Sequence, residues 1–103
     1  MANGYLKILG YRYAIVVDAS LGHMGQVRAS ALQIRLDAHL PRQQLESTLL
    51  HEIIEALNHA LELKLEHGAI AGLEAGLYQV LTDNGVDLTP LLHSIEHELN
   101  GST

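Results

Sequence analysis

The first third of the chain has the short apolar runs and two-residue alternation that predict β-strands. Residues 6–17 are rich in β-branched and aromatic side chains. Gly10 interrupts them, which predicts two short strands around a turn or bulge. Turn-forming residues without a period predict a loop over 18–25. Within residues 27–36, apolar and polar positions alternate as they do in a strand with one buried face.

Helical spacing replaces this alternation in the rest of the chain. The first apolar stripe predicts a helix from about Pro41 to Leu63, and the second, after a break at 64–68, ends at Asp83-Asn84-Gly85, a typical C-cap sequence. Thr89-Pro90 predicts the start of a short final helix. The stripes comprise Leu45, Leu49, Leu50, Ile53, Ile54, Leu57, Ala60 and Leu61, then Ile70, Leu73, Leu77, Val80 and Leu81, and finally Leu91, Leu92, Ile95 and Leu99.

Strands followed by helices indicate an α+β fold. We expect a small antiparallel sheet packed against two main helices and a short C-terminal helix. The length of 103 residues and the apolar content of 48% predict a single domain over residues 1–103 with its own core.

The charge pattern narrows the possible partners. The net charge is −6, and the six Lys and Arg residues are scattered, which argues against a nucleic-acid partner. The sequence has neither a signal peptide nor an apolar run of membrane-spanning length, so we expect a cytoplasmic protein without membrane contact. There is no Cys for a thiolate site, but seven His in so short a chain prompt a search for metal ligands.

A candidate metal site lies on the first predicted helix, in the sequence His51-Glu52-Ile53-Ile54-Glu55. Residues four apart share a helix face, so His51 and Glu55 can point at one ion. Glu52, rotated by about 100° from His51, can address a water molecule beside the ion. Without a further ligand, the same pattern fits the polar face of an ordinary amphipathic helix.

Glu74 strengthens the metal interpretation because its helical neighbours Ile70, Leu77 and Leu81 are apolar. A carboxylate in an inward-facing stripe needs a partner, and an ion shared with His51 and Glu55 would provide one. The alternative is an ion pair between Glu74 and Lys64 or Arg42.

The segments Thr48–Leu57 and Leu73–Leu81 together resemble small phage and prophage proteins related to the ImmA/IrrE-like zinc metallopeptidases, over roughly residues 5 to 90. The gluzincin pattern of these enzymes is HExxH followed by Glu nineteen residues after the second His, and Glu55 and Glu74 are also nineteen apart. This chain has HEIIE, with Glu55 in place of that His. The added negative charge predicts a weaker Lewis acid than a two-histidine site provides.

The resemblance implies a minimal zincin-like fold, one zinc ion bound by His51, Glu55 and Glu74, and hydrolysis of a peptide or protein substrate. Glu52 would be the general base that takes a proton from the attacking water. The strand from Gln33 to Leu36 would offer an edge for an extended peptide.

Tyr78 lies four residues after Glu74 on the same helix face. It is a candidate catalytic residue that hydrogen-bonds a ligand or stabilises an oxyanion. The alternative is a tyrosine at the margin of the core with its hydroxyl group in water.

Other histidines offer rival ligands. His59 lies four residues after Glu55, which would shift the site by one helical turn. His93 and His97 also have ligand spacing, and His93 would approach the site if the last helix folds back. We assign no chemistry to the remaining three, His23, His39 and His67.

Three functional hypotheses follow from the sequence. The first is a zinc peptidase of the bacterial host cytosol, if the protein is phage-encoded. The second is a catalytically inactive relative that acts as a binding or structural module, as the loss of the second His suggests. The third is a homo-oligomeric interaction protein, because the leucine-rich stripes exceed what so small a sheet can cover.

Overall fold

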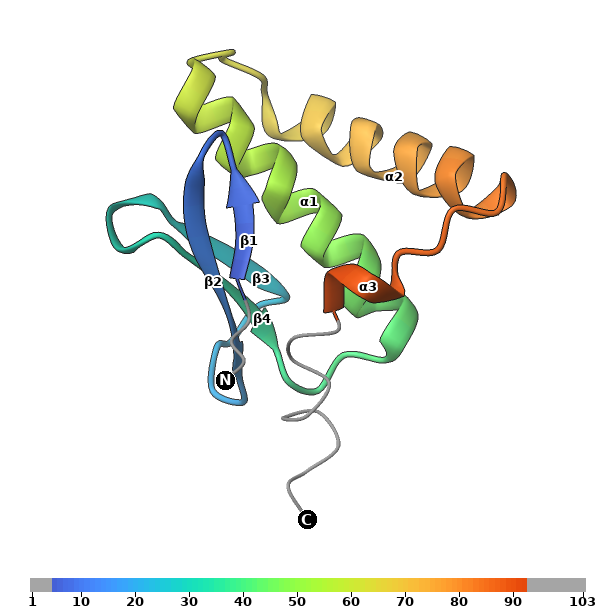
Figure 1. The fold of residues 1–103 in the computed structure, drawn as a ribbon, viewed down its shortest axis with the longest axis horizontal. Coiled ribbons are helices and arrows are strands. Elements are labelled where there is room, and N and C mark those ends of the chain that lie inside the picture. Colours follow the sequence, from blue (N-terminus) through green and yellow to red (C-terminus); the bar gives the residue numbers. More distant parts are fainter. Residues whose placement is uncertain (1–4, 93–103) are drawn as a thin grey trace.

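The computed structural model describes residues 5–92, and it confirms the predicted α+β class. The strands come first and the helices follow (Figure 1). Pro41 immediately precedes the first helix, whose ends lie within two residues of the predicted ones. The elements are β1 (Tyr5–Ile8), β2 (Tyr11–Asp18), β3 (Gly25–Arg28), β4 (Gln33–Asp37), α1 (Arg42–Leu61), α2 (His67–Asp83) and α3 (Thr89–Leu92), with a 3-10 turn at Ala29–Ala31.

The four strands form one mixed sheet in the order β1-β2-β4-β3. The β1–β2 and β3–β4 pairs are antiparallel, but β2 and β4 are parallel, with Ile15 opposite Ile34. The prediction of an all-antiparallel sheet is therefore wrong at this central pair. The connection between β2 and β4 exceeds the dozen or so residues that a parallel pairing needs, because it contains β3.

The segment 27–36 forms parts of two strands instead of the single strand predicted. A 3-10 turn at Ala29–Ala31 ends with Leu32 in the left-handed region, at φ 52°. Neither glycine nor proline marks this turn, so the alternation of apolar residues conceals it. As a result β4 is an interior strand, the predicted edge at Gln33–Leu36 is wrong, and β3 is the edge strand beside it, with β1 at the opposite edge.

The turn predicted at Gly10 is confirmed. Leu9 and Gly10 both have positive φ, at 52° and 86°, and they join β1 to β2 as a two-residue hairpin turn. Such turns have the twist that matches the flanking strands, and glycine adopts the second position without strain.

The helices form two layers beside the sheet. Helix α1 lies across one face of the sheet, and α2 packs on the other side of α1 (Figure 1). Of the α2 side chains only Ile70 is buried, and it packs with Leu50 and Ile54 of α1. The prediction that the whole second stripe faces inward is wrong, because α2 is separated from the sheet by α1.

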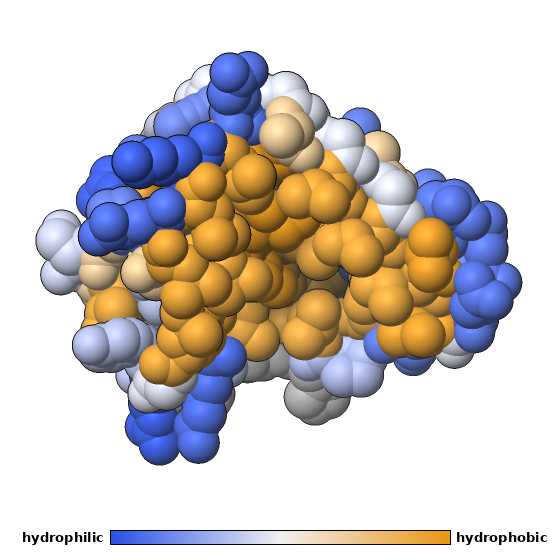
Figure 2. Space-filling view, turned by 90° about the horizontal axis from the view of Figure 1, so that it is seen from above, coloured by the Kyte–Doolittle hydropathy of each residue, from blue (hydrophilic) through white to orange (hydrophobic). Residues whose placement is uncertain are grey.

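The exposed part of that stripe gives the molecule an apolar surface. Leu73, Leu77 and Val80 have 45%, 41% and 50% of their surface exposed. Figure 2 shows the molecule from above, with apolar side chains covering much of this face around a central hollow and polar side chains along its margins.

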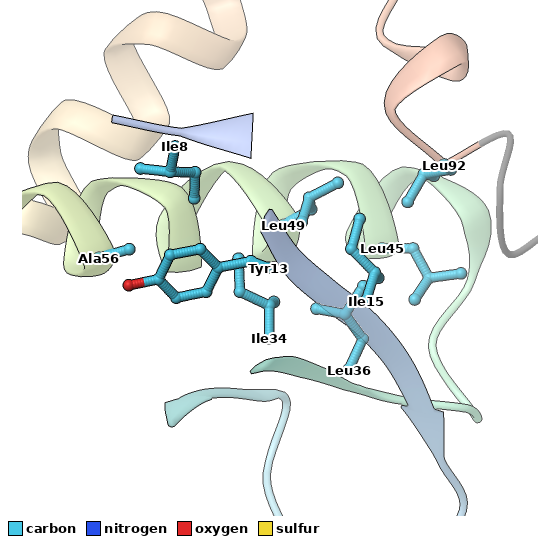
Figure 3. Close-up of a cluster of buried hydrophobic side chains, with 9 residues drawn as sticks. All are labelled: Ile8, Tyr13, Ile15, Ile34, Leu36, Leu45, Leu49, Ala56 and Leu92. Carbon is cyan, nitrogen blue, oxygen red and sulfur yellow. The ribbon is translucent and has the colours of Figure 1, made fainter. Parts of the chain in front are cut away.

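The main core lies between the sheet and α1. Ile34 and Leu36 of β4 meet Leu49 of α1 there, and none of the three has exposed surface. Leu92 of α3 closes one end beside Leu45, as Figure 3 shows. Burying aliphatic side chains of this kind contributes about 1.5–3 kcal/mol each, so this layer fixes the position of α1 and of the residues along it.

No helix within residues 5–92 is both long enough and apolar enough to cross a membrane.

Candidate metal centre

His51 of α1 lies between two carboxylates that contact opposite sides of its ring. Its Nε2 is 3.5 Å from Glu55 Oε2, one helical turn further along α1. Its Nδ1 is 2.9 Å from Glu74 Oε1 on α2. All three side chains are partly buried, with exposed fractions of 16% for His51, 32% for Glu55 and 25% for Glu74. The predicted register between the two helices therefore brings these three residues together.

The partner of Glu74 is His51, so the alternative ion pair with Lys64 or Arg42 is not formed. Arg42 instead approaches Glu46 at 3.9 Å, one turn along α1.

His67 has no chemistry predicted from the sequence, but it joins the same cluster. It is the first residue of α2, and its Nδ1 is 4.0 Å from Glu55 Oε2. Its ring lies edge-on to that of His51, with the centroids 5.6 Å apart. Ligand atoms of His51, Glu55 and His67 all lie within 4.8 Å of one another, so this group could hold a metal ion.

One sequence signal could have identified His67. It precedes Glu74 by seven residues, which is about two helical turns, so the two side chains lie on the same face of α2. Its position beside a predicted break obscured this relationship.

The connection between α1 and α2 positions His67. Asn58 of α1 accepts a hydrogen bond from the Leu65 N–H at 2.9 Å through its side-chain oxygen, and its amide group donates to the Leu65 carbonyl at 3.4 Å. Glu62 and Lys64, at φ 52° and 60°, turn the chain back towards α1. These contacts fix the start of α2 beside Glu55.

Glu52 is buried beside the cluster, with only 6% of its surface exposed. It lies against Gly25 of the edge strand β3, where an added Cβ atom would be 2.7 Å from Glu52 Oε2. Within residues 5–92 its carboxyl group has no hydrogen-bond partner. Burial raises its pKa to about 7, while His51 opposes the shift and the charges of Glu55 and Glu74 add to it.

Two cavities adjoin the cluster, and both are lined by Gly25, His51, Glu52 and His67. One of about 500 Å³ extends along β3 and is lined also by Glu55 and His59. The other, of about 530 Å³, is lined also by Glu74. The first cavity lies on the Glu55 side of His51 and the second on the Glu74 side, so both nitrogens of the His51 ring are near open space.

The donor set fits a tetrahedral ion such as zinc. Zinc–ligand bonds of 2.0–2.1 Å place neighbouring ligand atoms about 3.3 Å apart, and imidazole and carboxylate are both zinc ligands. The 3.5 Å between His51 Nε2 and Glu55 Oε2 is close to this separation. His67 Nδ1, on an exposed side chain, is 4.0 Å from Glu55 Oε2, which is slightly more than this separation.

Tyr78 lies outside this cluster. Its hydroxyl group donates a hydrogen bond to Glu46 Oε1 at 3.0 Å. Partial burial and the neighbouring Glu46 raise the pKa of Tyr78. It lines neither of the two cavities, so its proposed catalytic role is without support from this geometry.

The rival ligands have different positions. His59 lines the cavity along β3 without belonging to the group that could hold an ion. His93 and His97 lie outside the described residues.

Comparison of the chain with models of known protein families, with curated proteins and with solved structures finds no match.

Proposed function

We propose that this protein is a zinc-dependent hydrolase of peptide bonds. The observation that carries the proposal is the position of the buried Glu52 carboxyl group, next to a cluster of metal-ligating side chains in a cavity that follows an edge strand. This place thus contains a group that can activate a nucleophile, ligands for a Lewis acid and a surface for an extended substrate.

His51 of α1 is the ligand common to every arrangement. Glu55 and His67 lie on the Nε2 side of its ring, and Glu74 of α2 lies on the Nδ1 side. When bound, zinc would polarise the scissile carbonyl and lower the pKa of a water molecule. Three protein ligands leave the fourth position open for this chemistry.

Glu52 is the proposed general base. Glu52 lines both cavities and is adjacent in sequence to the ligand His51. It would accept a proton from the attacking water on one carboxylate oxygen and then donate it to the leaving amine nitrogen, which ends as a neutral amine. The close packing of Gly25 against Glu52 limits the movement of the carboxyl group during this transfer.

The edge strand β3 is the proposed binding surface for the substrate. It pairs with β4 along one side only, and its residues Gly25, Gln26 and Val27 line the cavity that contains His51 and Glu52. An extended peptide that adds to this edge would place its backbone beside these side chains.

A catalytically inactive, metal-binding module is the second candidate. The observation in its favour is the carboxylate of Glu55 in contact with His51, because a negative ligand in place of a second histidine on α1 weakens the Lewis acidity of a bound ion. A homo-oligomeric interaction protein is the third, and the exposed Leu73, Leu77 and Val80 support it.

Two measurements on protein prepared without a histidine tag test the first candidate. Elemental analysis should find one zinc ion per chain, and a library of unstructured peptides should be cleaved. Glu52→Gln should retain the zinc and lose the cleavage. Cleavage that persists in this variant would exclude Glu52 as the base, while zinc without any cleavage would favour the inactive module.

A further inference from the structure

The two nitrogens of the His51 ring face different helices. Nδ1 is 2.9 Å from Glu74 of α2, whereas Nε2 is 3.5 Å from Glu55 of α1. The two nitrogens point away from each other in the plane of the ring, so a single ion cannot bind to both sides of His51. Glu55 and Glu74 therefore cannot both bind the ion that His51 binds in this arrangement.

The ring nitrogen that would bind the ion follows from the neighbours on each side. The Nε2 side contains Glu55 and, beside it, His67. No group of three possible ligands other than His51, Glu55 and His67 occurs in the described part of the chain. A histidine that binds a metal usually donates its other N–H to a carboxylate, which fixes the tautomer and the orientation of the ring. Glu74 has the position of that carboxylate.

We propose that the ion is held by His51 Nε2, Glu55 and His67, and that Glu74 is a positioning residue that accepts a hydrogen bond from His51 Nδ1–H. This assignment rests on the proposed metal-dependent function, and it changes which residues define the site.

The assignment makes the ion a link between two helices that otherwise share few apolar contacts. His51 and Glu55 belong to α1 and His67 begins α2, whose one buried side chain is Ile70. An ion bound at this point would hold the start of α2 against α1. Because only the folded protein presents all three ligands together, the ion would also raise the melting temperature.

Binding of Zn²⁺ to tag-free protein, measured by isothermal titration calorimetry, tests the proposal without an activity assay. We expect one binding site. His67→Ala should lower its affinity for Zn²⁺ by more than about 100-fold, which is the largest effect expected for a residue that only orients a ligand. Glu74→Ala should weaken it by about 10- to 100-fold. Glu74→Gln should have a smaller effect, since its amide oxygen still accepts the hydrogen bond. His39→Ala, which removes an exposed histidine away from the cluster, is the matched control.

Long-range ¹H–¹⁵N spectra of the histidine rings supply a second readout. The metal-free protein should show His51 protonated at Nδ1, and Zn²⁺ should shift the resonances of His51 Nε2 and of a nitrogen of His67. Circular dichroism confirms that each variant is folded.

The possible outcomes are distinct. If Glu74→Gln abolishes binding and His67→Ala leaves it unchanged, Glu74 is the ligand and this inference fails, while the metal-dependent function stands. If the wild-type protein binds no Zn²⁺, both the inference and the proposed function fail.

Discussion

Gly25 of β3 and Glu52 of α1 are packed so closely that a Cβ atom at Gly25 would lie 2.7 Å from Glu52 Oε2 and 2.7 Å from Thr48 Cγ2. Glycine at this position allows the edge strand to approach the helix that carries the candidate base. The contact joins the proposed substrate-binding edge to the proposed catalytic carboxyl group.

Gly25→Ala should therefore disturb both stability and the site. The added methyl group must displace Glu52, Thr48 or the edge strand, and overpacking of this kind costs about 1–3 kcal/mol in the free energy of unfolding. Urea denaturation measures this loss, and any peptide cleavage should fall with it.

Gly72→Ala is the matched control for this substitution. A Cβ atom at Gly72 meets nothing within 4 Å, and alanine is favoured over glycine in a helix by about 1 kcal/mol. This variant should be at least as stable as the wild type. Equal stability of Gly25→Ala and the wild type would mean that β3 and α1 separate easily.

Glu52 should make the metal-free protein less stable as the pH rises. Its pKa is about 7 in the folded protein against a usual 4.5, because burial disfavours the charged form. The folded state thus binds a proton that the unfolded state has released between these values, and stability falls across this range. The fall ends above pH 7 and amounts to about 3 kcal/mol, at about 1.4 kcal/mol per pKa unit.

Chemical denaturation from pH 4 to pH 8 in the presence of a chelator measures this effect. Glu52→Gln cannot ionise, so the difference in stability between variant and wild type should change over the same range. A difference that is constant with pH would show that Glu52 has an ordinary pKa in the folded protein.

Much of the fold, but only part of the site, could be predicted from the sequence. The helices were predictable because the period of their apolar residues is long and regular. The division between β3 and β4 was not, since Leu32 adopts a left-handed conformation that is rare for leucine and that no local signal marks. The parallel pairing of β2 with β4 depends on that division.

Helical spacing in the sequence predicts only part of the site. The register of His51 with Glu55 is local, and the spacing of nineteen positions from Glu55 to Glu74 sets how far apart these residues of the two helices are along the chain. Which ring nitrogen of His51 faces which carboxylate depends on the path of the connection, where Asn58 binds Leu65. The position of His67 close to Glu55 depends on the same tertiary contact.

The pair of Asp18 and Arg35 should stabilise the sheet at neutral pH and lose this effect in acid. Arg35 Nη2 donates to Asp18 Oδ2 at 2.7 Å, between β4 and the end of β2. This hydrogen bond, with those from Ser20, lowers the pKa of Asp18 from 3.8 to about 2. Stability that the carboxylate contributes is complete above pH 3.8 and is lost as the pH falls through 2.

Asp18→Asn should accordingly lower the melting temperature at pH 7 and have a smaller effect near pH 2. Ser30→Ala, at an exposed site in the turn between β3 and β4, controls for a general effect of surface substitution. If Asp18→Asn has the same effect at both pH values, the charge of Asp18 does not stabilise the sheet.

We expect the apolar surface of α2 to mediate self-association of the protein. Leu73, Leu77 and Val80 are exposed, and their spacing puts them on one face of the helix. Gly76 adjoins this face with open space around it, although glycine costs a helix about 1 kcal/mol relative to alanine. Close approach of a second helix would explain glycine at this position, whereas the single chain does not.

Sedimentation equilibrium over a range of protein concentrations measures the association. The wild type should form dimers that the double substitution Leu73→Gln and Leu77→Gln converts to monomers, with α-helical content preserved. Ala75→Gln changes an exposed residue on another face of α2 and should leave the dimer intact. If the wild-type protein remains monomeric at high concentration, the apolar face binds another partner, because an exposed surface of this kind is costly to keep in water.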